Sequence, residues 1–308
     1  MLPLESVPNF SEGRDRATIA AIGEALSGGA RLLDVHSDPD HNRSVFTLVG
    51  ADEPLIDALL AGVAAARERV DLRRHAGAHP RIGAADVVPV VPLHPEDMER
   101  ARPAALELAR RIGVELGLPV FLYGELAQGR GPAFFRQGGT EELGRRLVAG
   151  EVTPDFGPPA LDPSAGGVIV GARRPLIAFN VDLRGATPED ARAIATVVRE
   201  RNGGFPGVRA LGLDLPRAGL AQVSMNVEDW EAAALHEIVA RIEAEAAARG
   251  AEVAGSELVG LMPAGAAVAA AGAILRIDGF DGSHVLELRL LDRAVRSAHI
   301  RHSPGTDT

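Results

Sequence analysis

The order of predicted secondary structure repeats along the chain, and this repeat limits the possible folds more than any other feature. Between residues 5 and 93, runs with strand or helix periodicity follow the order strand, helix, strand, strand, helix, strand. The same order returns between residues 176 and 259. A βαββαβ run is typical of the ferredoxin-like unit, an antiparallel sheet with two helices on one face. The sequence therefore predicts an α+β fold of two ferredoxin-like subdomains packed side by side.

Turn and capping residues set the bounds of both copies. The first copy is predicted as a strand, a helix, two strands, a helix and a strand over residues 5–10, 15–26, 31–36, 44–49, 55–70 and 86–93. The corresponding ranges of the second copy are 176–183, 187–201, 208–213, 220–227, 230–248 and 252–259. Ser11 and Thr187 are the predicted caps of the two first helices.

The segment between the two copies completes the predicted organisation. It contains a predicted helix over 97–116, a strand over 120–123, a helix over 140–149 and a stretch rich in proline and glycine over 153–167. A chain of 308 residues exceeds what one core usually supports, so two units are expected. We place the boundary near residues 172–175, which gives subdomains 1–173 and 174–308.

Composition excludes several classes of function. Lys and Arg number 32 against 42 Asp and Glu, and a net charge of -10 argues against nucleic acid or an anionic membrane surface as the partner. An anionic small substrate would need a locally basic pocket. The absence of cysteine excludes disulfides and thiol nucleophiles. The N-terminus has no signal-peptide pattern, and the longest apolar run, 264–275, is too short to span a bilayer, so a cytoplasmic protein is expected.

One loop is longer in the first copy than in the second. Residues 71–85 (DLRRHAGAHPRIGAA) stand where the second copy has only Arg249-Gly250-Ala251, and long loops on a repeated scaffold usually carry function. The loop contains His75 and His79, and histidine is the natural proton carrier near neutral pH. A structural role for both histidines stays open from the residues alone. No metal is expected, because Gly77 and Pro80 interrupt any helical pairing of the histidines.

Two other segments have two interpretations each. The stretch 154–171 is either a stiff linker or a wall that lets the backbone approach a flat ligand. In the run VPNFSEG at 7–13, capping and ligand contact are equally open. His36 and His41, near a turn between two strands, are predicted to lie on the surface.

A series of motifs resembles the glutamate formimidoyltransferase family. In family order they are VPNFSEGR at 7–14, HNRSVFTLVG at 41–50, HAGAHPRIGAADVVPVVP at 75–92, FLYGELA at 121–127, PDFGP at 154–158, GARRPLIAFNVDL at 171–183, QVSMNVED at 222–229 and SELVGLMP at 256–263. So many long motifs in register make the resemblance specific. The fold of that family, two ferredoxin-like subdomains, agrees with the repeat.

The resemblance implies a reaction and a set of residues. The family transfers the formimino group of N-formimino-L-glutamate to tetrahydrofolate, a co-substrate, and the histidine of its HPR signature, here His79, is the acid and base. The folate-contacting segment falls on 157–166, with Ala165 where relatives often have a larger residue. Its expected contacts are Gly157, Pro158, Pro163, Ser164 and Gly166. A homodimer is implied, and a separate cyclodeaminase is expected in the pathway.

Both substrates carry carboxylates, so arginines are expected around His79. Arg81 is the first choice because it is the nearest in sequence, and the other predicted substrate contacts are Arg43, Arg173, Asn9 and Asn180. Two alternatives stay open: formyl transfer from N-formylglutamate, and a folate- or amino-acid-binding regulator without catalysis.

Overall fold

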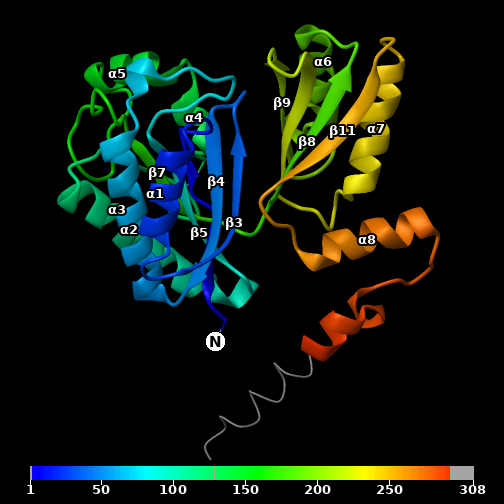
Figure 1. Ribbon diagram of the computed structural model, residues 1–308, viewed down its shortest axis with the longest axis horizontal. Helices are drawn as coiled ribbons and strands as arrows, with labels where there is room; N and C mark the ends of the chain where they lie inside the picture. Colours follow the sequence, from blue (N-terminus) through cyan, green and yellow to red (C-terminus); the bar gives the residue numbers. More distant parts are fainter. Residues whose placement is uncertain (1, 128, 292–308) are drawn as a thin grey trace, which may run out of the picture.

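The protein is an α+β structure in which two β-sheets stand face to face, with helices on the two outer sides (Figure 1). The computed structural model describes residues 2–127 and 129–291. The predicted α+β class is therefore confirmed. The chain passes from the first sheet to the second between residues 172 and 177. Residues 292–308 of the predicted second subdomain lie outside the described residues.

The first sheet is larger than predicted. Its seven strands are β1 (Leu4–Ser6), β2 (Asn9–Phe10), β3 (Arg31–Asp38), β4 (Arg43–Gly50), β5 (Ala85–Pro92), β6 (Val120–Gly124) and β7 (Val168–Ala172). They lie in the order β3, β4, β1 with β2, β5, β7, β6. Pairing is antiparallel from β3 to β5, and β7 then pairs parallel with both β5 and β6. The predicted strand over 5–10 is interrupted at Val7-Pro8, since proline has no N–H for the ladder.

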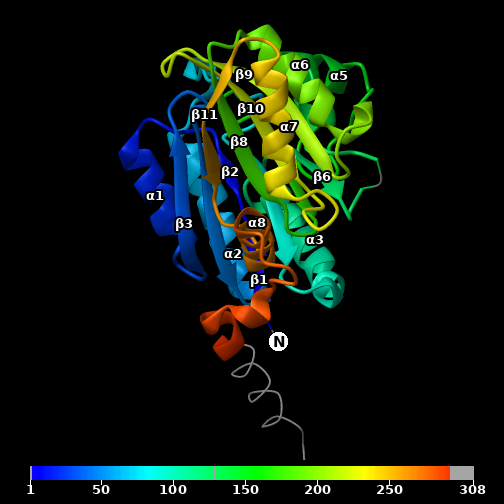
Figure 2. The ribbon, with the colours of Figure 1, turned by 90° about the vertical axis from the view of Figure 1, so that its right-hand side faces the viewer.

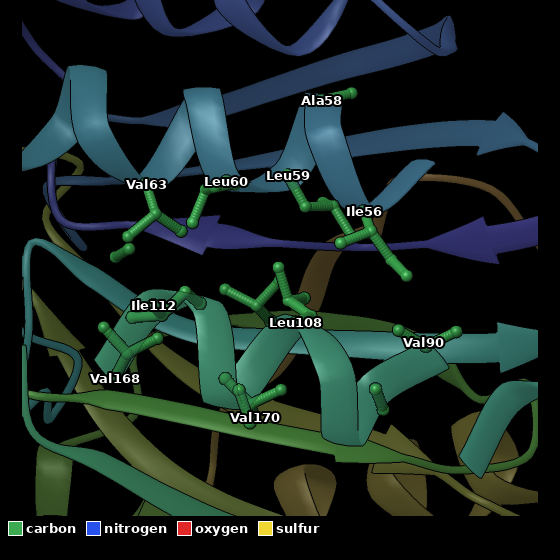
Figure 3. Packing of buried hydrophobic residues seen from close by; sticks show 14 of the residues in the cluster. Ile56, Ala58, Leu59, Leu60, Val63, Val90, Leu108, Ile112, Val168 and Val170 are labelled. Carbon is green, nitrogen blue, oxygen red and sulfur yellow. The ribbon is translucent and has the colours of Figure 1, made fainter. Parts of the chain in front are cut away.

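Three helices cover one face of this sheet: α1 (Arg16–Leu26), α2 (Asp52–Arg69) and α3 (Met98–Glu115). Figure 3 shows Leu59 of α2 and Leu108 of α3 meeting above Val90 and Val170 of the sheet. Helix α1 begins at Arg16, more than one turn after Ser11, so Ser11 is not its N-cap. Asp15 is its N-cap and accepts from the N–H of Ala17, whereas the Ser11 hydroxyl donates to the carbonyl of Gly83.

Two short helices, α4 (Pro132–Arg136) and α5 (Gly139–Val148), cover part of the other face. Phe135 of α4 and Leu143 of α5 pack there on Phe121 and Ile169, beneath β6 and β7. The rest of that face, over β3, β4 and β2, is turned toward the second sheet (Figure 1). The first sheet thus has one fully covered face and one shared face.

The second sheet has strands in the order β11 (Glu252–Val259), β8 (Ile177–Arg184), β10 (Leu220–Val227) and β9 (Val208–Leu215), all antiparallel. Helices α6 (Pro188–Val198) and α7 (Leu235–Ala247) cover its outer face (Figure 2). Thr187 caps α6 as predicted, in a capping box with Asp190. The predicted helix over 230–248 begins only at Leu235, and Trp230 packs beside Gly265 of α8 (Ala264–Leu275). None of the described helices is long and apolar enough to cross a membrane.

The contacts between the two sheets are polar. His41 Nε2 lies 3.0 Å from Gln222 Oε1, and the backbone N–H of Arg217 donates to Asp40 over 3.2 Å. His36 Nε2 lies 3.1 Å from Glu257. The apolar side chains that form the cores of the two units pack instead against their own helices. Because a buried polar group costs free energy unless it is hydrogen-bonded, this polar region is suited to binding polar molecules rather than to forming a core.

Candidate active site

The histidine loop of residues 75–81 folds back onto the turn between β3 and β4. The N–H of Ala78 donates to the carbonyl of Asp40 over 3.0 Å, and the side-chain amide of Asn42 donates to the carbonyl of Ala76 over 3.1 Å. Gly77 must be glycine, because a Cβ there would lie 2.2 Å from the carbonyl oxygen of His41. The turn and the loop therefore form one rigid unit.

Arg81 holds this loop with all five of its N–H groups. Nε and Nη2 donate to the carbonyl of His79 over 3.1 and 2.6 Å, and the carbonyls of Asn42 and His41 accept from Nη1 and Nη2 over 3.2 and 3.0 Å. Nη1 also lies 2.7 Å from Nδ1 of His75. No N–H is left for a substrate carboxylate. The position of Arg81 thus favours a role in fixing the backbone of His79 rather than the clamp expected from sequence proximity.

Replacing Arg81 by lysine tests this role. An ammonium group has three donors and no planar fork, so it cannot keep the five bonds that Arg81 makes to three carbonyls and to His75. We expect Arg81→Lys to lower the melting temperature and kcat together while KM for the amino-acid substrate changes less than about threefold. Thermal melts and steady-state kinetics measure this, with the exposed Arg110→Lys as control. A large rise in KM without loss of stability would instead mean that Arg81 binds a substrate carboxylate.

Among the described residues, none forms a hydrogen bond with Nε2 of His79. Its Nδ1 lies 2.8 Å from the carbonyl oxygen of Pro80. Because a carbonyl only accepts, the neutral ring carries its hydrogen on Nδ1, and Nε2 is an acceptor. Burial, and then the positive charges of Arg43 and Arg136, hold the pKa of His79 well below its usual value. The ring is therefore neutral at physiological pH and can accept a proton.

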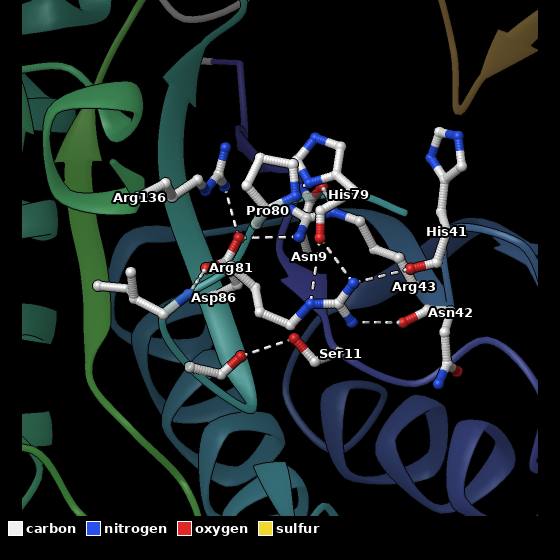
Figure 4. Close-up of polar contacts among 12 residues, drawn as sticks. Asn9, Ser11, His41, Asn42, Arg43, His79, Pro80, Arg81, Asp86 and Arg136 are labelled. Atoms are coloured by element: carbon white, nitrogen blue, oxygen red, sulfur yellow. Dashed lines mark hydrogen bonds and ion pairs between the residues drawn. The ribbon is translucent and has the colours of Figure 1, made fainter. Parts of the chain in front are cut away.

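A buried carboxylate gathers arginines beneath His79 (Figure 4). Asp86 of β5 accepts from Arg43 Nη1 over 2.8 Å and from Arg136 Nη2 over 2.5 Å, and its other oxygen accepts from the N–H of Ile82 over 2.8 Å. These positive charges outweigh the cost of burial and hold the pKa of Asp86 far below its usual range. Burial lowers the pKa of Arg43 to about 10, so it stays charged. The charge of Asp86 also acts on Arg81, whose N–H groups bond to the loop and the turn instead.

The residues Asp86, Arg136 and His41 were missed as site residues. Asp86 is an acidic side chain in an otherwise apolar strand, DVVPVV, and this was the signal that was available. Arg136 comes from the short helix α4, fifty residues beyond Asp86, and nothing local in the sequence links the two. The surface position predicted for His41 is wrong, since this residue is only 6% exposed, and strand β10 of the second sheet covers it. His36 is likewise half-buried, against Glu257.

The other predicted substrate residues are divided between three places. Asn9 lies in the site, where its Oδ1 accepts from Arg43 Nε over 2.9 Å and orients that guanidinium. Asn180 belongs to the facing sheet and donates to Glu257 over 2.8 Å. Arg173 follows Ala172, which pairs with Val90. Arg173 is therefore level with Val91, five residues from Asp86, and its backbone lies about 16 Å along the sheet from that of Asp86.

The predicted folate segment, 157–166, borders the histidine loop. The carbonyls of Ser164 and Ala165 accept from the N–H groups of Leu72 and Ala84, one on each side of the loop. Gly166 has a φ of 72°, and a Cβ there would lie 2.0 Å from the carbonyl of Ile82. Its glycine is thus required by the protein's own backbone. Ala165 is buried, while Gly157, Pro158 and Pro163 are exposed.

A pocket of about 380 Å³ opens between the two units beside this loop. On one side it is lined by Arg14, Asp40 and the loop residues 76–78, and on the other by Asp214, Pro216 and Arg217. Its size is in the usual range for small-molecule sites. Within residues 2–127 and 129–291, no His, Asp or Glu side chains are grouped so that they could hold a metal ion.

Comparisons with known proteins test the family resemblance seen in the motifs. The family description "Formiminotransferase domain, N-terminal subdomain" matches residues 3–173, and "Formiminotransferase domain" matches residues 178–281. Glutamate formimidoyltransferase of Thermoplasma acidophilum is 38% identical over 93% of this chain and 97% of its own length. The protein of the same name from Streptococcus pyogenes serotype M1 is 39% identical over 94% and 98%. Formimidoyltransferase-cyclodeaminase of Sus scrofa is 42% identical over 84% of this chain and half of its own length. The resemblance is confirmed, and the chain belongs to the formiminotransferase domain family.

Proposed function

We propose that this enzyme transfers the formimino group from N-formimino-L-glutamate to tetrahydrofolate, with His79 as the proton carrier. The observation that carries the proposal is the neutral imidazole of His79, which presents Nε2 beside a surplus of arginines. Relatives that match nearly the whole chain are glutamate formimidoyltransferases. A regulator that only binds its ligand has no need of such a base.

Tetrahydrofolate supplies the nucleophile, its secondary amine N5. His79 Nε2 takes the proton that N5 loses as N5 bonds to the formimino carbon, and returns a proton to the glutamate nitrogen as the bond between that nitrogen and the carbon breaks. No net proton is gained or lost. Proton transfer by a positioned histidine contributes a factor of about 10²–10⁴ to the rate. The bond from His79 Nδ1 to Pro80 keeps Nε2 free for this step.

Arg43 and Arg136 are the proposed carboxylate-binding residues. Both are charged and largely buried, and among the described residues no partner accepts from the buried Nε of Arg136. A buried N–H without a partner costs free energy, and a substrate oxygen would remove that cost. Arg43 is oriented by Asn9 and Asp86. Arg173 and Asn180 stay predicted contacts for more distant parts of the substrates.

The segment 157–166 is the proposed folate-binding segment, since it borders both ends of the histidine loop. We assign residues 1–173 and 174–308 to two ferredoxin-like subdomains. The strand orders β5, β1 with β2, β4, β3 and β11, β8, β10, β9 support this assignment. A homodimer in the cytoplasm, with a separate cyclodeaminase acting on the product, completes the proposal.

The deciding assay measures glutamate release from N-formimino-L-glutamate in the presence and absence of tetrahydrofolate. We expect turnover that depends on the folate, and at least about a hundredfold lower kcat/KM with N-formylglutamate, whose neutral amide carbon is less reactive. Comparable rates with both donors would favour the formyl-transfer alternative. Tight binding of either ligand without turnover would favour a regulator.

A further inference from the structure

A chain of hydrogen bonds links the second sheet to the catalytic loop. Gln222 of β10 donates from Nε2 to Asp182 of β8 over 2.9 Å. Its Oε1 lies 3.0 Å from Nε2 of His41, which comes from the first unit. Gln222 is 1% exposed, and a polar side chain is buried at a cost unless its bonds are made. Both ends of this amide are bonded, one to each unit.

The direction of these bonds fixes the state of His41. A carboxylate only accepts, so the NH₂ group of Gln222 must face Asp182 and its oxygen must face His41. His41 Nε2 then has to carry a hydrogen and donate it. The amide therefore determines both the tautomer and the orientation of the His41 ring.

The His41 ring in turn lies against the ring of His79. Their centroids are 5.9 Å apart and their planes are inclined by 34°. Among the described residues, the ring of His79 makes a single hydrogen bond, from Nδ1 to the carbonyl of its neighbour Pro80. A single bond lets the His79 ring rotate about that bond. The adjacent His41 ring limits this motion and keeps water away from the His79 ring.

We infer that Gln222 is a positioning residue for proton transfer at His79, and that it acts through His41. The inference rests on the proposed function, because it assigns a neighbour to the proton carrier of that reaction. The inference gives a role to Gln222 and His41, which the catalytic proposal does not use. They are the first residues of the motifs QVSMNVED and HNRSVFTLVG. The inference also makes the site complete only when both sheets are in place.

The charged surroundings of the two rings come from several elements. His79 faces Arg43 of β4, Arg136 of α4 and Asp86 of β5. His41 is linked to Asp182 by hydrogen bonds through Gln222. The carboxylate of Asp38 accepts from the backbone N–H of His41 over 2.6 Å. Removing the His41 ring would admit water to His79 and take away one group that lowers the pKa of His79. Both changes raise that pKa.

A double-mutant cycle tests the inference. We expect Gln222→Leu to lower kcat about tenfold with less than a twofold change in KM. In a His41→Ala background the same substitution should lower kcat by less than about twofold further, because the ring through which Gln222 acts on His79 is absent. His41→Ala should also move the acid limb of the kcat/KM profile to higher pH. Asn226→Leu, an exposed position on the same face of β10, is the control and should change neither constant.

Other outcomes would overturn the inference. Additive losses of kcat in the double variant would mean that Gln222 does not act through His41. A rise in KM alone, or a lower melting temperature with normal kcat, would make Gln222 a binding or structural residue. If Gln222→Leu does not fold, Gln222→Met keeps the length of the side chain without an oxygen that accepts from His41, and it takes the place of Gln222→Leu in the cycle. If the parent enzyme shows no turnover, the proposed function has failed, and NMR titration of the His79 ring in the same variants still decides whether Gln222 acts on it.

Discussion

Replacing His79 by alanine is expected to lower kcat at least about a hundredfold, because the site then has no base at the reacting nitrogen. The dissociation constant of the folate should change little, since His79 contributes a proton acceptor and not the arginines or the segment 157–166. Single-turnover kinetics with fluorescence titration of the folate separate the two effects. In the parent, the acid limb of the profile should lie below pH 6.5, since the pKa of His79 is lowered and activity falls only where His79 becomes protonated.

His94→Ala is the matched control, because this histidine is exposed and caps a short 3₁₀ turn that follows β5, at the opposite end of that strand from the loop. It should keep the kinetic constants of the parent. Near-normal kcat in the His79 variant would remove the mechanism proposed above. Loss of folate binding in that variant, with intact fold, would instead assign His79 to ligand binding.

Replacing Asp86 by asparagine is expected to cost about 3–5 kcal/mol of the free energy of unfolding. The substitution keeps the shape but leaves Arg43 and Arg136 without their shared counter-charge in a buried place. Chemical denaturation monitored by circular dichroism measures the loss. Glu107→Gln, which breaks an exposed pair with Arg110, is the control and should change stability far less.

The same carboxylate predicts how stability depends on pH. The pKa of Asp86 is lower in the folded protein than in the unfolded chain, so its contribution is fully present above about pH 4. It is lost progressively as the pH falls toward the folded-state pKa. In Asp86→Asn this part of the acid sensitivity should disappear. Parallel acid denaturation curves in parent and variant would contradict the assignment.

The repeat was predictable because it is written in local patterns. Alternating apolar residues, the Thr187 cap and the Gly250 turn each indicate an element without reference to the rest of the chain. Strand β7 was missed because it follows a proline- and glycine-rich stretch and is buried on both faces, so it has no alternation. The start of α7 was misplaced since Trp230 serves packing before the helix, not within it.

The site was predictable only where a motif carries it. His79 and the loop around it follow from the family resemblance, and Arg43 and Asn9 were named as contacts. The role of Arg81 could not follow from its position, because its partners are backbone carbonyls that come together only in the folded turn. The arrangement of Asp86 with Arg136, or of His41 with Gln222, depends on pairing between distant strands and helices.

The place of the N-terminal strands has a consequence for synthesis. β1 and β2 lie in the middle of the first sheet, between β4 and β5, and not at its edge. Strands β1 and β2 therefore have no complete set of partners until residue 92 has left the ribosome, and β6 cannot join the sheet before β7 arrives at residue 172. Pairing over such sequence separations slows folding. The first unit is thus complete only as translation of the second unit begins, and until then a nascent chain exposes the edge of β5 that β7 later covers.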